Sequence, residues 1–354
     1  MSLGCQFRYK VLRQEDATEA TRQLELDVIA GLQSQPKHLS STYFYDQEGS
    51  ALYQQITELD EYYLTRCEFE ILKTHGKSIC DRYFGHGQPV NLVELGAGDG
   101  RKTRVLLKEL LEAQVDFQYV PIDISESAMK ELVMGLKSEF QDSHLQCFGL
   151  VGDYKDGLQW LSSQQHFRKN FVLFLGSSIG NFTRENAIRF LRGLAQILRD
   201  GDELLLGADL LKDPMIMTRA YMDSKQVTRR FNLNLLKRIN RELKADFDCN
   251  EWYHYAFYRS DIQAVESQLI SKVPQQVYLG SSGLRFSLEA FEPIHTEYSH
   301  KYLLQDLKQI AAYSGMQCCE FLFDENKWFV DCIWKVDCHN SASKSSNDQQ
   351  HQYS

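Results

Sequence analysis

The sequence predicts an α/β protein whose main part is a doubly wound parallel sheet, and three observations carry this prediction. Short apolar runs alternate with helical patterns from about residue 65 to residue 211. The first run ends in a glycine-rich turn, and the alternation stops after Leu211. Strands separated by helices of this length imply right-handed crossovers and a parallel sheet. The remaining segments then form a second part.

The chain of 354 residues is long enough for two compact parts, because single domains usually hold about 100 to 200 residues. Apolar residues make up 43% and charged residues 25% of the chain, which are ordinary values for a globular protein. These proportions exclude a disordered chain, a collagen-like fibre and a small disulfide-stapled scaffold.

Residues 1–64 show no alternation of strands and helices, and they are rich in aromatic residues after residue 40. We therefore assign this segment to the second part. Thr65 and Glu68 have the spacing of a capping box, in which a Ser or Thr begins a helix and a Glu three residues later bonds back to it. This spacing predicts a helix that begins at Thr65 and opens the main domain, residues 65–211.

Five apolar runs in the main domain are predicted strands. They cover residues 90–96, 117–125, 145–154, 170–182 and 203–211. The fourth run is the most continuously apolar, as expected for a strand that is buried on both faces. Helical spacing separates the runs, and Thr183 is placed to cap the helix before the fifth.

The chain beyond residue 211 is predicted to supply an insertion and then the rest of the sheet. Residues 212–300 begin with one long polar helical pattern and continue with β-like segments. Residues 301–338 have the pattern of a helix and two strands, which we expect to complete the sheet as an antiparallel edge. Residues 339–354 lack apolar periodicity, and we expect this tail to be disordered.

Charge and cysteine content favour a small-molecule partner and a cytoplasmic location. The chain has 48 acidic and 39 basic residues, a net charge of −9, which argues against nucleic acid or an anionic membrane as the partner. No run approaches the ~18 apolar residues of a membrane span, and the N-terminus lacks the apolar stretch of a secretory signal. The nine cysteines form no Cys-x-x-Cys pair, so we expect reduced thiols and no metal site. We also expect a monomer.

The glycine-rich turn VELGAGDG, Val93 to Gly100, is the most informative local motif. Glycine is needed where the backbone approaches a ligand closely or takes a positive φ, so the turn predicts a nucleotide-type cofactor. Arg101 stands where a dinucleotide fingerprint requires Gly or Ala, which disfavours NAD and FAD. No Gly-Lys-Ser/Thr follows, which excludes a P-loop. The Gly-x-Gly-x-Gly form resembles the first motif of class I S-adenosylmethionine (SAM) methyltransferases.

Three further residues follow the second and third predicted strands. Asp123 lies 27 residues after Gly96, at a strand end where an acidic side chain accepts hydrogen bonds from ribose hydroxyls. Asp153 and Tyr154 end the third strand, where they can contact and stack on adenine. Each alone is also an ordinary turn residue, but all three at successive strand ends predict an adenosyl pocket.

Over residues 36–336 the chain resembles one family, the ergothioneine-pathway histidine Nα-methyltransferases with their fungal relatives that act on dimethylallyltryptophan. The motifs that carry the resemblance are STYFYDQEGSALYQQITELDEYYLTRCEFEIL, LVELGAGDGRKTRVLL, PIDIS, VGDY, LFLGSSIGNF, LLLGADLLKDP, RAYMD, FNLNLLKRINRELKADFD and HTEYSHKY. The resemblance implies a class I SAM-methyltransferase (Rossmann-like) fold with a second, substrate-binding domain built from the N-terminal segment and the late insertion. It also implies SAM-dependent, repeated methylation of histidine to the trimethylated betaine, hercynine.

The resemblance further implies which residues contact the cofactor. They are Tyr45, Gly96, Gly98, Lys102, Asp123, Asp153 and Tyr154. Lys102 would pair with the methionyl carboxylate of SAM. Tyr45 would lie close to both the cofactor and the reacting amine.

A second set of residues is implied to bind the amino-acid substrate. They are Tyr62, Gly176, Asn181, Tyr221, Ser267, Glu297 and Ser299. Asn181 and Tyr221 would lie near the carboxylate and amine of the substrate and, with Tyr45, have the catalytic role of orienting the amine. An imidazole needs one acceptor and one donor, which Glu297 and Ser299 supply from one face of a strand. Apart from the resemblance, Glu297 would be an ordinary charged strand residue.

Two departures from the family leave the substrate open. Ser267 stands where the histidine enzymes typically have a methionine lining the side-chain pocket, and Tyr53 replaces a phenylalanine. A smaller, more polar residue favours another aromatic amino acid, such as a tryptophan derivative. Glu297 favours histidine, because an indole offers one N–H and no acceptor. The alternatives from other functional classes are a non-catalytic SAM-binding protein and a methyltransferase that acts on protein or nucleic acid.

Overall fold

The computed structural model describes residues 6–12, 17–84, 87–164 and 168–337. The chain divides into two compact units. The first unit consists of residues 1–14, 66–210 and 302–354, and the second of residues 15–65 and 211–301. The predicted tail at 339–354 lies outside the described residues. No helix in the described part of the chain has the length and apolar character needed to cross a membrane.

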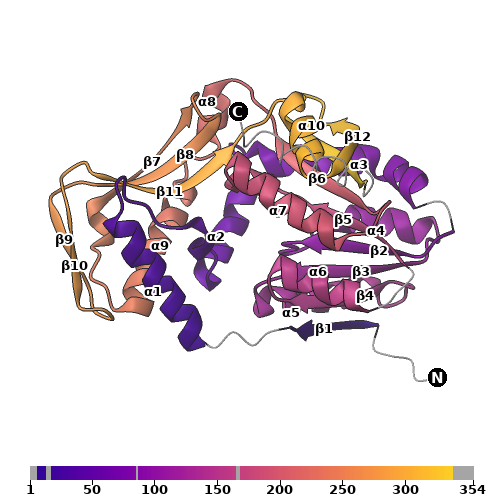
Figure 1. Ribbon diagram of the computed structural model, residues 1–354, viewed down its shortest axis with the longest axis horizontal. Coiled ribbons are helices and arrows are strands. Elements are labelled where there is room, and N and C mark those ends of the chain that lie inside the picture. The colour runs from indigo at the N-terminus through magenta and orange to yellow at the C-terminus, as the bar shows by residue number, and fades with distance from the viewer. Residues whose placement is uncertain (1–5, 13–16, 85–86, 165–167, 338–354) are drawn as a thin grey trace, which may run out of the picture. The chain divides into compact units, whose positions relative to one another are not determined.

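The first unit is built on a mixed eight-stranded sheet (Figure 1). In spatial order its strands are β1 (Phe7–Val11), β4 (Gln146–Val151), β3 (Phe117–Asp123), β2 (Val90–Leu95), β5 (Lys169–Phe174), β6 (Glu203–Asp209), β13 (Phe329–Val336) and β12 (Met316–Phe323). The first six strands are parallel, whereas β13 runs antiparallel to β6 and β12 antiparallel to β13. This order confirms the predicted doubly wound sheet and its antiparallel edge.

Helices cover both faces of this sheet because the central strands are apolar on both sides. The helices are α3 (Tyr63–Tyr83), α4 (Thr103–Glu112), α5 (Glu126–Phe140), α6 (Tyr154–Ser163), α7 (Arg184–Ile197) and α10 (Leu304–Tyr313). The apolar residues of α6, α7 and α10 join one buried core with strand residues such as Val93 and Val172. All six residues of β2 are buried, and β2 lies between β3 and β5 in the sheet. The glycine-rich turn that follows β2 is therefore held near the middle of the edge at which the parallel strands end.

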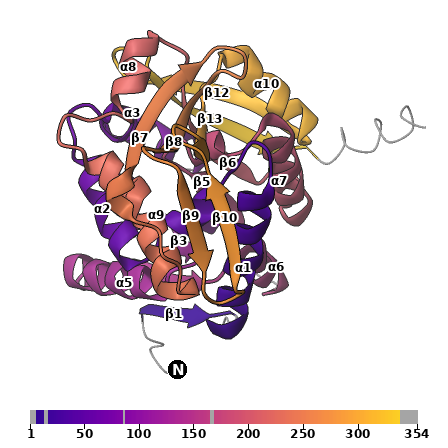
Figure 2. The ribbon, with the colours of Figure 1, turned by 90° about the vertical axis from the view of Figure 1, so that its left-hand side faces the viewer.

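The second unit combines a small sheet, a hairpin and helices. Its three-stranded antiparallel sheet has the order β11 (Pro293–His300), β8 (Ala264–Ser271), β7 (Trp252–Arg259). The strands β9 (Gln275–Leu279) and β10 (Leu284–Leu288) form a separate hairpin (Figure 2). The helical elements are α1 (Ala17–Gln33), η1 (Ser41–Phe44), α2 (Gln47–Thr57), α8 (Pro214–Arg219), α9 (Val227–Leu243) and η3 (Cys249–Glu251). The helix α9 packs against α2 and β7 and is buried along most of its apolar face.

Three expectations about local structure were wrong. Residues 1–14 do not belong to the second unit, because β1 pairs with β4 at the edge of the large sheet. The helix expected to begin at Thr65 begins at Tyr63. The single long helix expected after residue 211 is two helices, α8 and α9, because the Asp223 carboxylate accepts hydrogen bonds from the backbone N–H groups of Val227 and Thr228 and begins a new helix there.

Candidate active site

The glycine-rich turn of the first unit has the backbone geometry that only glycine adopts readily. Gly96, Gly98 and Gly100 have φ values of +73°, +53° and +62°. A Cβ atom on Gly96 would lie 2.8 Å from the hydroxyl oxygen of Tyr154, closer than side-chain contacts allow. The turn therefore leaves a cradle beside Tyr154 that any larger residue would fill, and this fits a cofactor lying against the backbone.

Asp123 and Tyr154 lie at the glycine-rich turn, whereas Asp153 caps the helix α6. The Asp123 carboxylate accepts hydrogen bonds from the backbone N–H groups of Gly98, at 3.1 Å, and Ser125, at 2.9 Å. One Asp153 oxygen caps α6 by accepting from the N–H of Asp156 at 2.7 Å. Burial, with the charge of Asp123, raises the pKa of Tyr154 to about 12. The structure thus brings Gly96, Gly98, Asp123 and Tyr154 together.

Lys102 is held by a buried glutamate that sequence reasoning missed. The Lys102 ammonium forms an ion pair with Glu68, whose side chain is fully buried. The same carboxylate accepts from the backbone N–H of Gly176, at 2.8 and 2.9 Å to its two oxygens. Gly176 has φ +77°, and a Cβ there would lie 3.5 Å from the Lys102 nitrogen. Glu68 therefore fixes two predicted ligand-binding positions at once.

Two further acids are buried in the first unit. Asp331 on β13 is fully buried, and neither of its carboxylate oxygens has a hydrogen-bond partner among the described residues. Burial raises the pKa of Asp331 well above its ordinary value; the charge of Glu68 adds to this and that of Lys102 opposes it. Burial also raises the pKa of Glu94 on β2 to about 7, against two side-chain hydrogen bonds that lower it. Asp331 therefore keeps its proton far above the pH at which an ordinary aspartate loses it.

The last predicted site residue of the first unit is Asn181. It ends the short helix η2 (Ser178–Asn181) after β5, and it is exposed. Ser177, which precedes this helix, has φ +57°, and its hydroxyl accepts from the backbone N–H of Asp209. The turn that carries Asn181 is thereby tied to the end of β6.

In the second unit, tyrosines and one phenylalanine form an aromatic wall. The ring of Tyr45 lies 5.5 Å from that of Tyr53 and 5.6 Å from that of Phe231, both edge-on. The rings of Tyr62 and Tyr221 are 6.0 Å apart and also edge-on. Burial raises the pKa of the Tyr62 hydroxyl well above its ordinary value, and the nearby tyrosine hydroxyls add to this effect. Tyr45 is 41% exposed, so the wall has an accessible end.

The strand β11 carries the predicted imidazole-binding pair beside this wall. Glu297 lies directly opposite Ser267 on β8, and a bulge between His295 and Glu297 sets that register. Burial raises the pKa of Glu297 to about 7, and the charge of Lys301 opposes this shift. The hydroxyl of Ser299 lies 2.6 Å from that of Tyr221. The second unit therefore brings Ser267, Glu297, Ser299 and Tyr221 together.

Lys301 is the second functional residue that sequence reasoning missed. Its side chain is completely buried, and its ammonium donates to the hydroxyl oxygens of Tyr221 and Ser299. The available signals were weak: Lys301 lies inside the HTEYSHKY motif, and Glu68 lies inside the TRCEFE segment. A charged residue within a matched motif marks a position, but partners such as Lys102 for Glu68 and Tyr221 for Lys301 come from segments distant in sequence.

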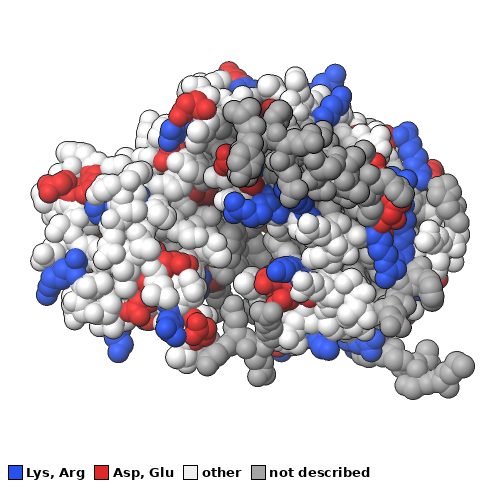
Figure 3. All heavy atoms as spheres, viewed as in Figure 1, with Lys and Arg blue, Asp and Glu red and all other residues white. Residues whose placement is uncertain are grey.

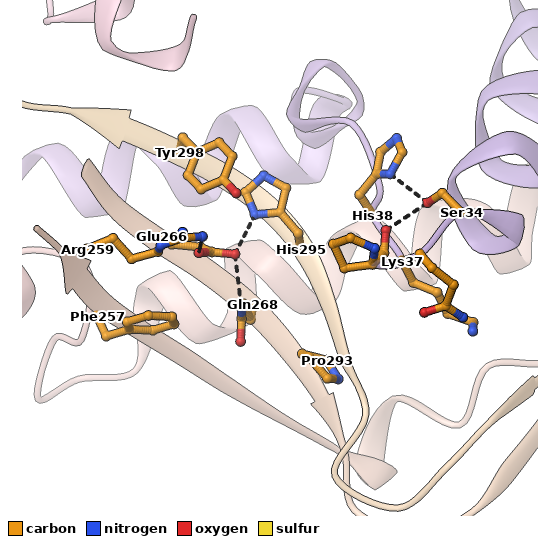
Figure 4. A pocket seen from close by; sticks show the side chains of 12 residues that line it. Ser34, Lys37, His38, Phe257, Arg259, Glu266, Gln268, Pro293, His295 and Tyr298 are labelled. Atoms are coloured by element: carbon orange, nitrogen blue, oxygen red, sulfur yellow. Dashed lines mark hydrogen bonds and ion pairs between the residues drawn. The ribbon is translucent and has the colours of Figure 1, made fainter. Parts of the chain in front are cut away.

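A cavity of about 700 Å³ lies on the other face of the small sheet (Figure 4). Glu266 and Gln268 flank Ser267 on β8, so their side chains point away from the face that carries Ser267. The Glu266 carboxylate is engaged by Arg259, Gln268 and His295. The polar groups of this cavity satisfy one another, which is the arrangement of a structural network.

On the face seen in Figure 3, acidic and basic side chains are interspersed among uncharged ones. Among the described residues, no group of three or more His, Cys, Asp or Glu side chains is arranged to hold a metal ion.

The chain matches known proteins along most of its length. A family model described as "Histidine-specific methyltransferase, SAM-dependent" matches residues 24–336. The histidine N-alpha-methyltransferase of Mycobacterium tuberculosis is 38% identical over 85% of this chain and 91% of that protein. Its counterpart from Mycolicibacterium smegmatis is 35% identical over 89% and 93%. The 4-dimethylallyltryptophan N-methyltransferase of Claviceps purpurea is 28% identical over 82% and 88%.

These matches agree with the topology of the large sheet and with the glycine cradle. The resemblance stated from the motifs is confirmed, as are the class I methyltransferase fold and SAM as the cofactor. The chain belongs to the family of SAM-dependent, histidine-specific methyltransferases.

Proposed function

We propose that this enzyme transfers methyl groups from SAM to the α-amino group of free L-histidine, stepwise up to the trimethylated betaine, hercynine, as in ergothioneine biosynthesis. The relatives with 35% and 38% identity are named for methylation of histidine at this nitrogen. We also propose that it acts as a cytoplasmic monomer.

One observation supports histidine most strongly, the pairing of a carboxylate and a hydroxyl on one face of β11. Glu297 and Ser299 are two residues apart, so their side chains point the same way. The neutral imidazole of histidine has one N–H donor and one nitrogen acceptor. Glu297 accepts from the donor and Ser299 donates to the acceptor, so both ring nitrogens are satisfied.

The first unit provides the residues that hold the cofactor. SAM supplies an activated methyl group on a sulfonium sulfur. The glycine cradle at Gly96 has room for a ligand against the backbone. Asp123 is assigned to accept hydrogen bonds from the ribose hydroxyls, and Lys102, which Glu68 holds in place, is assigned to pair with the methionyl carboxylate of SAM. These side chains fit the charges and hydroxyls of SAM.

The remaining residues act on the amine of the substrate. The amine attacks only after it has lost its proton, and Tyr45, Tyr221 and Asn181 are assigned to orient its lone pair. The protein contributes alignment and desolvation, since a sulfonium group needs no acid to leave. The proton departs through water, and the cycle repeats at the same nitrogen.

The runner-up substrate is another aromatic amino acid, such as a tryptophan derivative. Ser267 supports this alternative, because it is small, buried and directly opposite Glu297. A carboxylate beside an indole would have one N–H to accept and a surplus of unpaired oxygen lone pairs, which is costly in a buried site. This cost favours histidine.

The test is mass spectrometry of the products formed from SAM and a mixture of the free proteinogenic amino acids. The proposal predicts mono-, di- and trimethylated histidine. Methylated tryptophan without methylated histidine would assign the pocket to the alternative substrate. Bound SAM with no methylated amino acid would support the non-catalytic alternative.

A further inference from the structure

Lys301 is a buried cation whose surroundings are built from predicted substrate-binding residues. It directly follows β11 and is 0% exposed. Its ammonium donates to the hydroxyl oxygen of Tyr221 at 2.9 Å and to that of Ser299 at 3.0 Å. It also lies 4.8 Å from the centre of the Tyr221 ring. Burying an ammonium group is costly unless its hydrogens are engaged, so these contacts are specific features of the site.

The ammonium fixes the direction of the hydrogen bonds in this triangle. An ammonium group only donates, so both hydroxyl oxygens accept from Lys301. The hydroxyls of Tyr221 and Ser299 are 2.6 Å apart, so one of them donates to the other. Of the two hydroxyl hydrogens, one is used within the pair and the other is directed to an acceptor outside the triangle.

We infer that Lys301 is a positioning residue for substrate recognition: it orients the Tyr221–Ser299 pair so that the pair donates a hydrogen bond to the ring nitrogen of the bound amino acid that lacks a proton. The inference rests on the proposed function, because the acceptor it names is the imidazole of histidine. Glu297 accepts from the other ring nitrogen. Lys301 therefore determines which tautomer of the ring is bound.

The charge of Lys301 also acts on Glu297. Burial raises the pKa of Glu297, and the Lys301 ammonium opposes that rise. Among the described residues, the titratable groups around the site are Glu297 on β11, Lys301 after it, Tyr221 after α8, Tyr62 before α3, Tyr53 on α2 and Tyr45 before α2. Removing the ammonium shifts the pKa of Glu297 upward, so the carboxylate needed for binding forms only at higher pH.

The experiment compares Lys301→Met with Lys37→Met. Methionine keeps most of the length of the side chain but removes the charge and all donors. Lys37 is the matched control, because it is a buried lysine in the same unit, 8% exposed, and is paired at 2.7 Å with Glu292 at the cavity on the other face. For each protein, the kcat and KM for histidine are measured across pH 6 to 9, with the dissociation constant for SAM and the thermal unfolding midpoint.

The inference predicts a KM for histidine about tenfold higher in Lys301→Met, with the acid limb of kcat/KM shifted up by about half a pH unit or more. SAM affinity stays within about twofold of wild type. Lys37→Met lowers the unfolding midpoint but leaves the KM and the acid limb in place. If Lys301→Met does not fold, Lys301→Arg provides the test: it retains the charge, so the acid limb stays while the KM rises.

Three results would overturn the inference. A KM and acid limb equal to wild type in a folded Lys301→Met variant would remove the positioning role. Equal losses of histidine and SAM binding would show that Lys301 only stabilises the fold. Wild-type protein that methylates another amino acid but not histidine would disprove the proposed function, and the inference with it. The first of these results, obtained with a wild-type enzyme that is active on histidine, would disprove the inference alone.

Discussion

At the scale of single residues, we expect Glu297 to set the pH range in which the enzyme binds its substrate. Its pKa is raised to about 7 by burial, so the group is increasingly protonated as the pH falls below that value. A protonated carboxyl binds the ring N–H less well, because it has lost the charge that strengthens the bond. We therefore expect kcat/KM for histidine to fall on the acid side of pH 7.

Glu297→Gln tests this titration directly. The amide keeps the size of the side chain and an acceptor oxygen but does not titrate near pH 7. We expect the KM for histidine to rise about tenfold, and the acid limb that belongs to Glu297 to disappear, leaving only the titration of histidine itself. Glu266→Gln, on the opposite face of β8, is the control and should keep the wild-type limb. An unchanged limb in Glu297→Gln would contradict the assigned role.

Glu68 is expected to control cofactor affinity through Lys102 and Gly176. Glu68→Gln keeps the shape of the side chain but removes the charge that holds the Lys102 ammonium. A neutral amide holds the Lys102 ammonium and the Gly176 N–H less firmly than a carboxylate does, so both positions are less well fixed for the cofactor and we expect SAM affinity to fall about tenfold. Calorimetric titration with SAM measures it, and Glu112→Gln, an exposed glutamate on α4, should bind as wild type does.

The sequence predicted some of these residues better than others, for a physical reason. The register of β11 and β8 places Ser267 opposite Glu297, because both strands belong to one antiparallel sheet. Glu68 and Lys301 were missed because each makes a contact with a residue distant in sequence: Glu68 with Lys102, 34 residues away, and Lys301 with Tyr221, 80 residues away. Local patterns do not contain such contacts.

At the scale of elements, the turn after β2 depends on glycine for two separable reasons. The positive φ of Gly96 strains any other residue, and a Cβ there would also collide with Tyr154. Gly283, in the loop between β9 and β10, has a similar φ of +72°, but a Cβ at that position would meet no atom within 4 Å. A substitution at either glycine therefore strains the backbone, but only a substitution at Gly96 brings a Cβ atom into collision with Tyr154.

Gly96→Ala and Gly283→Ala separate these effects. Each should lose about 1 to 2 kcal/mol of stability from the left-handed backbone, seen as a lower unfolding midpoint. Only Gly96→Ala should also abolish SAM binding, measured by calorimetry, because the Tyr154 side chain must move into the cradle. Retained SAM affinity in Gly96→Ala would contradict the cradle as a cofactor site.

Elements with strong local signals were predicted, and those shaped by distant contacts were not. The runs that became β2 to β6 are continuously apolar, because central parallel strands are buried on both faces. β1 was missed because it is an edge strand with alternating burial, and its partner β4 lies more than 130 residues away. The break between α8 and α9 depends on one side chain, Asp223.

At the scale of the whole molecule, buried acids make stability depend on pH. The folded protein keeps a proton on Asp331 that the unfolded chain releases above about pH 4, because the folded-state pKa is raised. The free energy of unfolding therefore decreases as the pH rises above that value, until the pH reaches the folded-state pKa. The slope attributable to one such group is about 1.4 kcal/mol per pH unit.

Asp331→Asn should remove this contribution. The amide carries no charge at any pH in the range, so the variant should gain stability relative to wild type as the pH is raised from 5 to 8. Chemical denaturation at several pH values measures the difference, and Asp142→Asn, at an exposed position, should follow the wild-type curve. A constant difference between Asp331→Asn and wild type across this range would contradict the raised pKa.

The division into two units was visible in the sequence as the end of the strand–helix alternation after Leu211, although residues 1–14 were placed in the wrong unit. The pattern shows where a sheet ends, because buried strands and amphipathic helices have distinct periods. It does not show which segments from distant parts of the chain fold together, since that depends on pairings such as β1 with β4.

The selection of histidine by Glu297 and Ser299 is tested by the ratio of kcat/KM for histidine to kcat/KM for tryptophan, measured with the wild-type enzyme at saturating SAM. A site that hydrogen-bonds both nitrogens of an imidazole should reject a ring lacking that pattern by a factor on the order of 10⁴. We expect a ratio of that size in favour of histidine. A ratio near one, or one that favours tryptophan, would show that Glu297 and Ser299 do not select the substrate.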